Sequence, residues 1–157
     1  MGNFFLAPYR HWKDSPNNWN YFDQHDVLST SDPIITFTKD EKNEGDKLLK
    51  FYDLEINRYI CFDARSSVGR KAGEELNNRN SSINTQIHGI QKLCQKNFKA
   101  LRMGAKGQEK ILNNDKNIID YANSNQKSAF NDIYLLFNCS FMVSTGSGVD
   151  CIPLLNR

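Results

Sequence analysis

From residue 34 onward, short apolar runs alternate with stretches whose apolar residues recur at helical spacing. The short runs are rich in β-branched and aromatic residues, and they predict strands over residues 58–64, 98–104, 117–122 and 140–145. The stretches with helical spacing predict helices over residues 39–54, 81–97, 127–139 and 147–157. Strands that alternate with helices predict a parallel sheet with helices on both faces, which is a Rossmann-like, doubly wound α/β domain.

Local signals mark where several of these helices begin and end. Thr38 is expected to cap the first helix, which has acidic residues in its first turn. Ser81 or Ser82 is expected to cap the second helix. Pro153 is expected to limit or bend the last helix, because proline removes a backbone donor.

The first part of the chain differs from the rest. Residues 1–33 mix aromatic side chains with Asp, Asn, Ser and Pro without periodicity, which predicts an irregular linker or interdomain segment. Trp12 and Trp19 in this segment need a partner that buries them. We therefore expect a domain over residues 34–157 that follows this linker.

Composition excludes several classes of protein. The chain has 157 residues, 39% hydrophobic and 24% charged, which is typical of one soluble globular domain. A net charge of +2 with scattered lysines gives no reason to expect a nucleic-acid partner. No apolar run approaches the roughly 20 residues of a membrane span. The four cysteines form no C-x-x-C pair, which favours reduced thiols in a cytoplasmic protein, and the histidines show no zinc-ligand spacing with them.

The ends of the predicted strands carry the candidate chemistry. Parallel sheets of this kind bind ligands outside the carboxyl ends of their strands. Arg65 follows the first core strand, Arg102 follows the second, and the sequence Ser-Thr-Gly-Ser-Gly at 144–148 follows the last. Two guanidiniums and a glycine-containing helix start predict an anion site, and a diphosphate would suit all three.

Each of these residues also has a structural interpretation. The hydroxyls at 144–148 could serve only as helix caps, and the arginines could pair with surface carboxylates such as Asp63. The 144–148 sequence lacks the Gly-Lys-Ser/Thr ending of a P-loop and the G-x-S-x-G pattern of a hydrolase. No D-x-D pair occurs, so a carboxylate-bound metal is not indicated. Asp120 and Asp132 are expected to be structural or solvated.

The order of several motifs resembles a known family. The motifs are "RMG" at 102–104, "IIDYA" at 118–122, "DIYL" at 132–135 and "STGSG" at 144–148. In this order and spacing, together with "YRHW" near the start and "ICFDARSS" at 60–67, the chain resembles a bacterial group of glycosyltransferases of the GT-B type, distantly similar to fucosyltransferases. The resemblance extends over nearly the whole chain.

The resemblance implies that residues 34–157 are the C-terminal, donor-binding half of a GT-B enzyme. Such a half binds a nucleotide-sugar donor without a metal or other cofactor, and the sugar passes to a glycan, lipid-linked or cell-surface acceptor. The acceptor half, which can also attach such an enzyme peripherally to a membrane, has no counterpart in this chain, and the chain is expected to stop before the domain is complete. A non-catalytic nucleotide-sugar-binding module, or a vestigial fragment, is the alternative function.

The resemblance also implies roles for individual residues. Arg65 matches a family arginine and is expected to contact the donor phosphates and to stabilise the leaving diphosphate. Asp63 stands where the family has a histidine, so the role of that histidine is not carried over. The remaining expected donor contacts are Arg79, Asn80, Arg102, Gly104, Ser144, Thr145, Gly146, Ser147 and Gly148.

Overall fold

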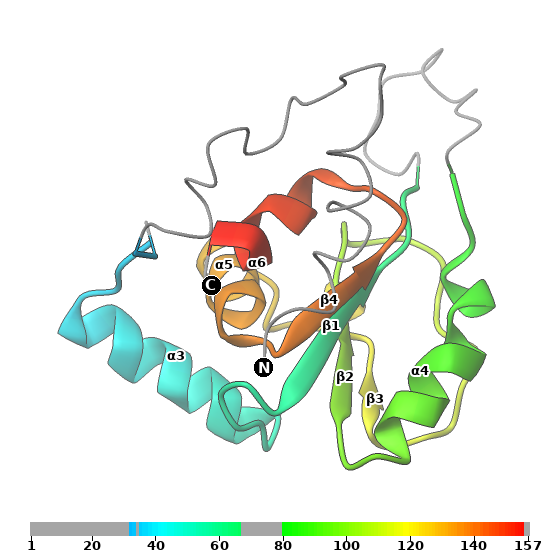
Figure 1. Cartoon of the computed structure of the whole chain (residues 1–157), viewed down its shortest axis with the longest axis horizontal. Coiled ribbons are helices and arrows are strands. Elements are labelled where there is room, and N and C mark those ends of the chain that lie inside the picture. Colours follow the sequence, from blue (N-terminus) through cyan, green and yellow to red (C-terminus); the bar gives the residue numbers. More distant parts are fainter. Residues whose placement is uncertain (1–31, 34, 67–79, 156–157) are drawn as a thin grey trace, which may run out of the picture.

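The computed structural model describes residues 32–33, 35–66 and 80–155. Within them, strands β1 (Tyr59–Asp63), β2 (Lys99–Arg102), β3 (Ile118–Ile119) and β4 (Phe141–Ser144) form one sheet in the order β3-β2-β1-β4 (Figure 1). All three neighbouring pairs are parallel. The chain therefore moves outward from β1 through β2 to β3, and then returns to the opposite side of β1. The same order begins the doubly wound sheets that bind dinucleotides.

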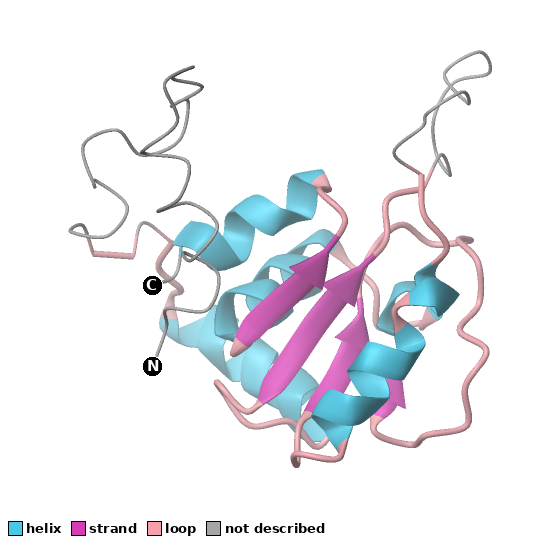
Figure 2. Cartoon of the chain, turned by 45° about the vertical axis from the view of Figure 1, so that its right-hand side comes forward, coloured by secondary structure: helices cyan, strands magenta, loops and turns pink. Residues whose placement is uncertain are grey.

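Helices cover both faces of this sheet (Figure 2). The α-helices are α3 (Lys39–Phe51), α4 (Ile87–Cys94), α5 (Ala129–Asn138) and α6 (Cys151–Leu155). Side chains of β1 alternate between the two faces, as the pleat of a strand requires. Tyr59 and Cys61 pack with α3 and α5, whereas Ile60 and Phe62 pack with α4. The prediction of an α/β fold with a parallel sheet between helices is confirmed.

The start of α3 agrees with the sequence. The hydroxyl of Thr38 accepts a hydrogen bond from the backbone N–H of Glu41 at 3.3 Å, and the Glu41 carboxylate accepts one from the Thr38 N–H at 2.7 Å. This capping box satisfies two of the free donors at the helix start. The helix ends at Phe51, earlier than predicted, and the ammonium of Lys99 binds the carbonyl of Asp53 at 2.7 Å just beyond it.

Two predicted elements are shorter than expected. The helix predicted at 81–97 is a 3₁₀ turn, η1 (Ile83–Thr85), followed by α4, and Ser82 caps η1 by accepting from the N–H of Asn84 at 3.2 Å. The strand predicted at 117–122 pairs only over β3 and then enters the 3₁₀ turn η2 (Tyr121–Asn123). The turn begins there because the side chains of Asp120 and Asn123 bond to each other at 2.8 Å.

The last predicted helix is also divided. A 3₁₀ turn, η3 (Gly148–Asp150), leads into α6, and Pro153 lies in the first turn of α6. A proline in a first turn removes no intrahelical hydrogen bond, so it does not end the helix. Residues 35–38, which lead into α3, form no regular strand.

The remaining expectations concern the linker, the thiols and the membrane. Apart from residues 32 and 33, the predicted linker, with Trp12 and Trp19, lies outside the described residues. Cys61, Cys94 and Cys139 are buried free thiols, as expected, whereas Cys151 is exposed. In the described part of the chain, every helix is too short or too polar to cross a lipid bilayer.

Candidate functional site

The carboxyl ends of β1 and β4 lie side by side, and several candidate residues meet there. Asp63 of β1 is in register with Ser144 of β4. The backbone N–H of Arg65 donates to the hydroxyl of Thr145 at 2.9 Å, and the Arg65 Nη1 atom approaches the carbonyl of Gly146 at 3.5 Å. We refer to Asp63, Arg65 and residues 144–148 as the β1–β4 site. The structure thus brings Arg65 and the predicted turn together.

The position of this site follows from the sheet topology. Between β1 and β4 the strand order reverses, because β1 leads outward to β2 whereas β4 returns from β3. The connections after these two strands therefore leave in opposite directions, and doubly wound sheets bind ligands at this reversal. Two hollows elsewhere on the described surface, of about 590 Å³ beside residues 111–115 and about 240 Å³ beside residues 53–55, are lined by no predicted site residue.

The turn at 144–148 acts as a cap in this structure. The Ser144 hydroxyl accepts from the N–H of Gly146 at 3.1 Å. The Asp150 carboxylate accepts from the N–H of Ser147 at 2.9 Å and from its hydroxyl at 3.0 Å. Helix capping, the structural interpretation, therefore applies to Ser147, whereas the Ser144 hydroxyl closes a local turn and the Thr145 hydroxyl binds Arg65. A phosphate at this turn would replace Ser144 and Asp150 as the acceptor for these two N–H groups.

Glycine is required at position 146 of the turn. Its φ is +87°, a conformation that side chains other than glycine rarely adopt, and a Cβ there would meet no atom within 4 Å. Thr145, Gly146 and Gly148 are exposed. The backbone of the turn is thus accessible to a ligand.

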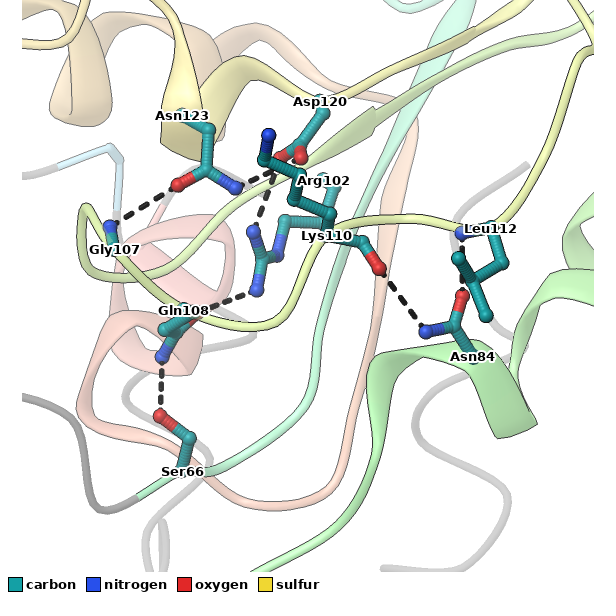
Figure 3. Close-up of polar contacts among 9 residues, drawn as sticks. All are labelled: Ser66, Asn84, Arg102, Gly107, Gln108, Lys110, Leu112, Asp120 and Asn123. Atoms are coloured by element: carbon teal, nitrogen blue, oxygen red, sulfur yellow. Dashed lines mark hydrogen bonds and ion pairs between the residues drawn. The ribbon is translucent and has the colours of Figure 1, made fainter.

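Arg102 is not placed as the sequence suggested. The residue is 1% exposed, and its guanidinium donates to Asp120 at 3.0 Å and to the Gln108 side chain at 2.8 Å (Figure 3). Direct contact with a ligand phosphate, the expected role, is not what this geometry favours. The structural interpretation fits Arg102, with the partner being Asp120 rather than Asp63.

The contacts of Arg102 continue in both directions as a chain of hydrogen bonds (Figure 3). On one side, the Gln108 amide donates to the hydroxyl of Ser66 at 2.8 Å, next to Arg65. On the other side, the Asn123 amide donates to Asp120 at 2.8 Å and accepts from the N–H of Gly107 at 3.0 Å. We call these residues the Arg102 network. It holds the segment after β2 across the ends of the strands and joins it to the segment that carries Arg65.

Asp63 is buried rather than on the surface, which corrects the expectation from sequence. It ends β1 and is 3% exposed. Its Oδ1 atom is buried and has no hydrogen-bond partner among the described residues. Burial is the main cause that raises the pKa of this carboxyl, and the charge of Asp150 raises it further. A hydrogen bond with Ser147 and the positive charge of Arg102 lower the pKa of Asp63 and so offset part of this rise.

Gly104 lies between the buried groups. Its φ is +118°, and a Cβ there would be 2.4 Å from the Gln108 Oε1 atom and 2.7 Å from the Asp63 Oδ1 atom. The absence of a side chain therefore allows these two oxygens to approach the backbone. The packing around Gly104 is therefore enough to explain why this position of "RMG" is a glycine. The predicted contact with a sugar donor is not needed to explain it.

The last two expected contacts are Arg79 and Asn80, in the segment between β1 and η1. Arg79 is outside the described residues. Asn80 is exposed, and the N–H of the next residue, Ser81, donates to the carbonyl of Arg65 at 2.9 Å. Asn80 therefore lies at the same edge of the sheet as Arg65.

Sequence reasoning missed Gln108 and Asp150. Asp150 follows Ser147 by three residues, a spacing typical of a capping box, so a signal was present. Gln108 lies in a segment without periodicity and had no such signal. In the described residues, no group of three or more His, Cys, Asp or Glu side chains is arranged to hold a metal ion.

Comparisons of the chain with protein-family models, curated proteins and solved structures each gave no match. Its function must therefore be inferred from its own residues.

Proposed function

We propose that this chain binds the diphosphate of a nucleotide sugar at the β1–β4 site. The observation that carries this proposal is the meeting of Arg65 with the 144–148 turn at the reversal of strand order. A guanidinium can bind a phosphate through two parallel hydrogen bonds, and the exposed glycines let a phosphate approach the backbone. The order of motifs, which resembles that of GT-B glycosyltransferases, suggests that the diphosphate belongs to a sugar donor.

In this proposal the chain is the donor-binding half of a metal-independent glycosyltransferase. Breaking the bond between the sugar and the diphosphate increases negative charge on the leaving phosphate. Arg65 stabilises that charge and so lowers the barrier to transfer. Arg102 and Gly104 are positioning residues, because they support the segments around Arg65 without facing the ligand. The acceptor and the group that deprotonates it belong to another domain or chain.

A second candidate is a binding module that does not catalyse transfer. It is favoured by Asp63, which occupies the position where the resembled family has a histidine and which is buried. A buried carboxyl cannot replace an accessible imidazole in sugar contact or proton transfer. Slow release of free sugar from a bound donor would favour the enzyme, whereas binding without release would favour the module.

Calorimetric titration with UDP-glucose, GDP-mannose and GDP-fucose tests the proposed binding. We expect at least one of them to bind, and Arg65→Ala to weaken its binding about tenfold or more, because a charge-assisted hydrogen bond contributes about 1.5–3 kcal/mol. The control is Arg58→Ala, since the Arg58 side chain is 73% exposed and precedes β1 at the opposite edge of the sheet. Equal affinity in wild type and Arg65→Ala, or no binding by the folded wild type, would contradict the proposal.

A further inference from the structure

The buried carboxyl of Asp63 lies between three segments that meet at the β1–β4 site. Arg102 approaches it from β2, while Ser147 and Asp150 approach it from the segment after β4. Gln108 and the backbone of Gly104 approach it from the segment after β2. Among the residues that the structure describes, the charged groups that act on Asp63 are Arg102 and Asp150, with Arg65 two residues further along the chain.

The positive charge near Asp63 is already shared. Arg102 donates to the carboxylate of Asp120 at 3.0 Å, so that guanidinium is neutralised by a second acid. Asp150 adds another negative charge, and its carboxylate is held by the Ser147 hydroxyl at 3.0 Å. An ionised Asp63 therefore has no cation of its own among these neighbours. A buried charge without a dedicated partner is unfavourable.

The hydrogen-bonding groups near the Asp63 Oδ1 atom also disfavour an ionised carboxylate, because an acceptor lies close to it and no donor of the described residues binds it. The Asp63 Oδ1 atom and the Oε1 atom of Gln108 lie 2.7 Å and 2.4 Å from the point that a Gly104 Cβ would occupy, so both oxygens are close to the same point. Gln108 Oε1 is an acceptor, since Arg102 donates to it at 2.8 Å. An ionised carboxylate offers only acceptors, whereas a protonated carboxyl has one donor. A proton on Asp63 would therefore provide a donor where the Oδ1 atom, unpaired within the described residues, and a second acceptor lie close to one point.

A bound diphosphate would increase this demand for a proton. It would place further negative charge at the 144–148 turn, where Ser147 interacts with both Asp63 and Asp150. Repulsion between the phosphates and an ionised Asp63 is strong in a poorly solvated site. Protonation of Asp63 removes that repulsion while Arg65 remains charged.

We propose that binding of a nucleotide diphosphate sugar at the β1–β4 site is coupled to the uptake of a proton by Asp63. This inference rests on the proposed function, because it requires the ligand to occupy that site. The ligand binds more tightly to the form in which Asp63 is protonated. Affinity therefore falls as pH rises through the range in which Asp63 of the free protein loses its proton, by up to about tenfold per pH unit.

Calorimetry in buffers with different heats of protonation measures this coupling directly. The probes are UDP-glucose, GDP-mannose and GDP-fucose, whose doubly esterified diphosphates lack the second ionisation that a phosphate monoester has near neutral pH. We expect uptake of up to about one proton per ligand bound in the wild type. In Asp63→Asn, which imitates the neutral carboxyl, we expect binding without uptake and with little dependence on pH.

The control is Asp132→Asn, which removes a partly buried carboxylate that is paired with Lys127 at 2.7 Å and lies on α5. It should leave proton uptake unchanged. Binding by the wild type without uptake, or uptake that persists in Asp63→Asn, would overturn the coupling and leave the proposed function intact.

A measurement on the wild type avoids dependence on a variant that fails to fold. Carbon-detected NMR follows the Asp63 carboxyl as pH changes, with and without each probe. We expect its midpoint to be above that of an ordinary aspartate in the free protein and to rise further with ligand. A midpoint that does not move on binding refutes the coupling. If no probe binds to the folded protein, the proposed function fails, and the coupling fails with it.

Discussion

Arg65 lies just after β1 and Arg102 ends β2, the neighbouring strand of one parallel sheet, yet their surroundings differ. Arg102 is 1% exposed and donates to Asp120 and Gln108. Arg65 is half-buried and lies against an exposed turn after β4. The difference arises from the strand order, since β2 has the acidic end of β3 as its outer neighbour, whereas β1 has the hydroxyl-rich end of β4. The strand beside each arginine therefore decides whether its guanidinium is enclosed by the fold or left at a partly exposed edge of the sheet.

Replacing each arginine by alanine should show most clearly how much each one contributes to the stability of the fold. We expect Arg102→Ala to lower the free energy of unfolding by about 3 kcal/mol, because it leaves Asp120, 25% exposed, without its partner. Arg65→Ala should cost less than about 1 kcal/mol, because its backbone bond to Thr145 remains. Urea unfolding of both variants measures the difference. Equal losses would mean that Arg65 is as structural as Arg102.

Two of the three described glycines with positive φ, Gly104 and Gly146, provide a second comparison. Gly104→Ala should lower the free energy of unfolding by about 2–3 kcal/mol, because a Cβ at φ +118° would also collide with Gln108 and Asp63. Gly146→Ala has the backbone strain of φ +87° without a collision and should cost about 1 kcal/mol. Thermal unfolding of both variants is the measurement. A greater loss for Gly146→Ala would show that the turn is the more tightly constrained region.

Asn123, which lies at the end of the Arg102 network farthest from Arg65, should contribute less to the free energy of unfolding. Asn123→Ala removes hydrogen bonds to Asp120 and Gly107, and we expect the free energy of unfolding to fall by about 1 kcal/mol. Amide hydrogen exchange should show faster exchange of the Gly107 N–H, with Asn125→Ala, an exposed neighbour, as the control. Unchanged exchange at Gly107 would contradict the role given to Asn123.

The smallest expected effect is on the pH dependence of stability. The pKa of Asp63 in the folded protein is raised, chiefly by burial, so the native state binds more protons than the unfolded state between the two pKa values. Its contribution to stability is complete below the unfolded pKa and is lost as pH rises through the folded pKa. In Asp63→Asn, this fall in the free energy of unfolding with rising pH should disappear. Urea unfolding at a series of pH values measures it. An unchanged decline in the variant would assign it to another group.

Much of the fold could be predicted from local patterns. The alternation of β-rich runs and helical spacing indicated the parallel sheet, and the Thr38 cap follows from a hydroxyl placed three residues before a glutamate. The meeting of Arg65 with the 144–148 turn was predicted because the ends of parallel strands share one edge. The division of the 81–97 helix and the shortness of β3 were not, because they depend on side-chain hydrogen bonds such as Ser82 to Asn84 and Asp120 to Asn123.

The sequence alone indicated the type and order of the main elements and placed Asp63, Arg65, Arg102 and the 144–148 turn near the strand ends, because these depend on the spacing of neighbours along the chain. Only the tertiary structure decided which of those residues became buried. Asp120 reaches Arg102 from 18 residues away, and Ser147 reaches Asp63 from the segment after the neighbouring strand β4. Such partners depend on the strand order β3-β2-β1-β4. That order results from packing helices on both faces of the sheet, and the periodicity of a single strand carries no information about it.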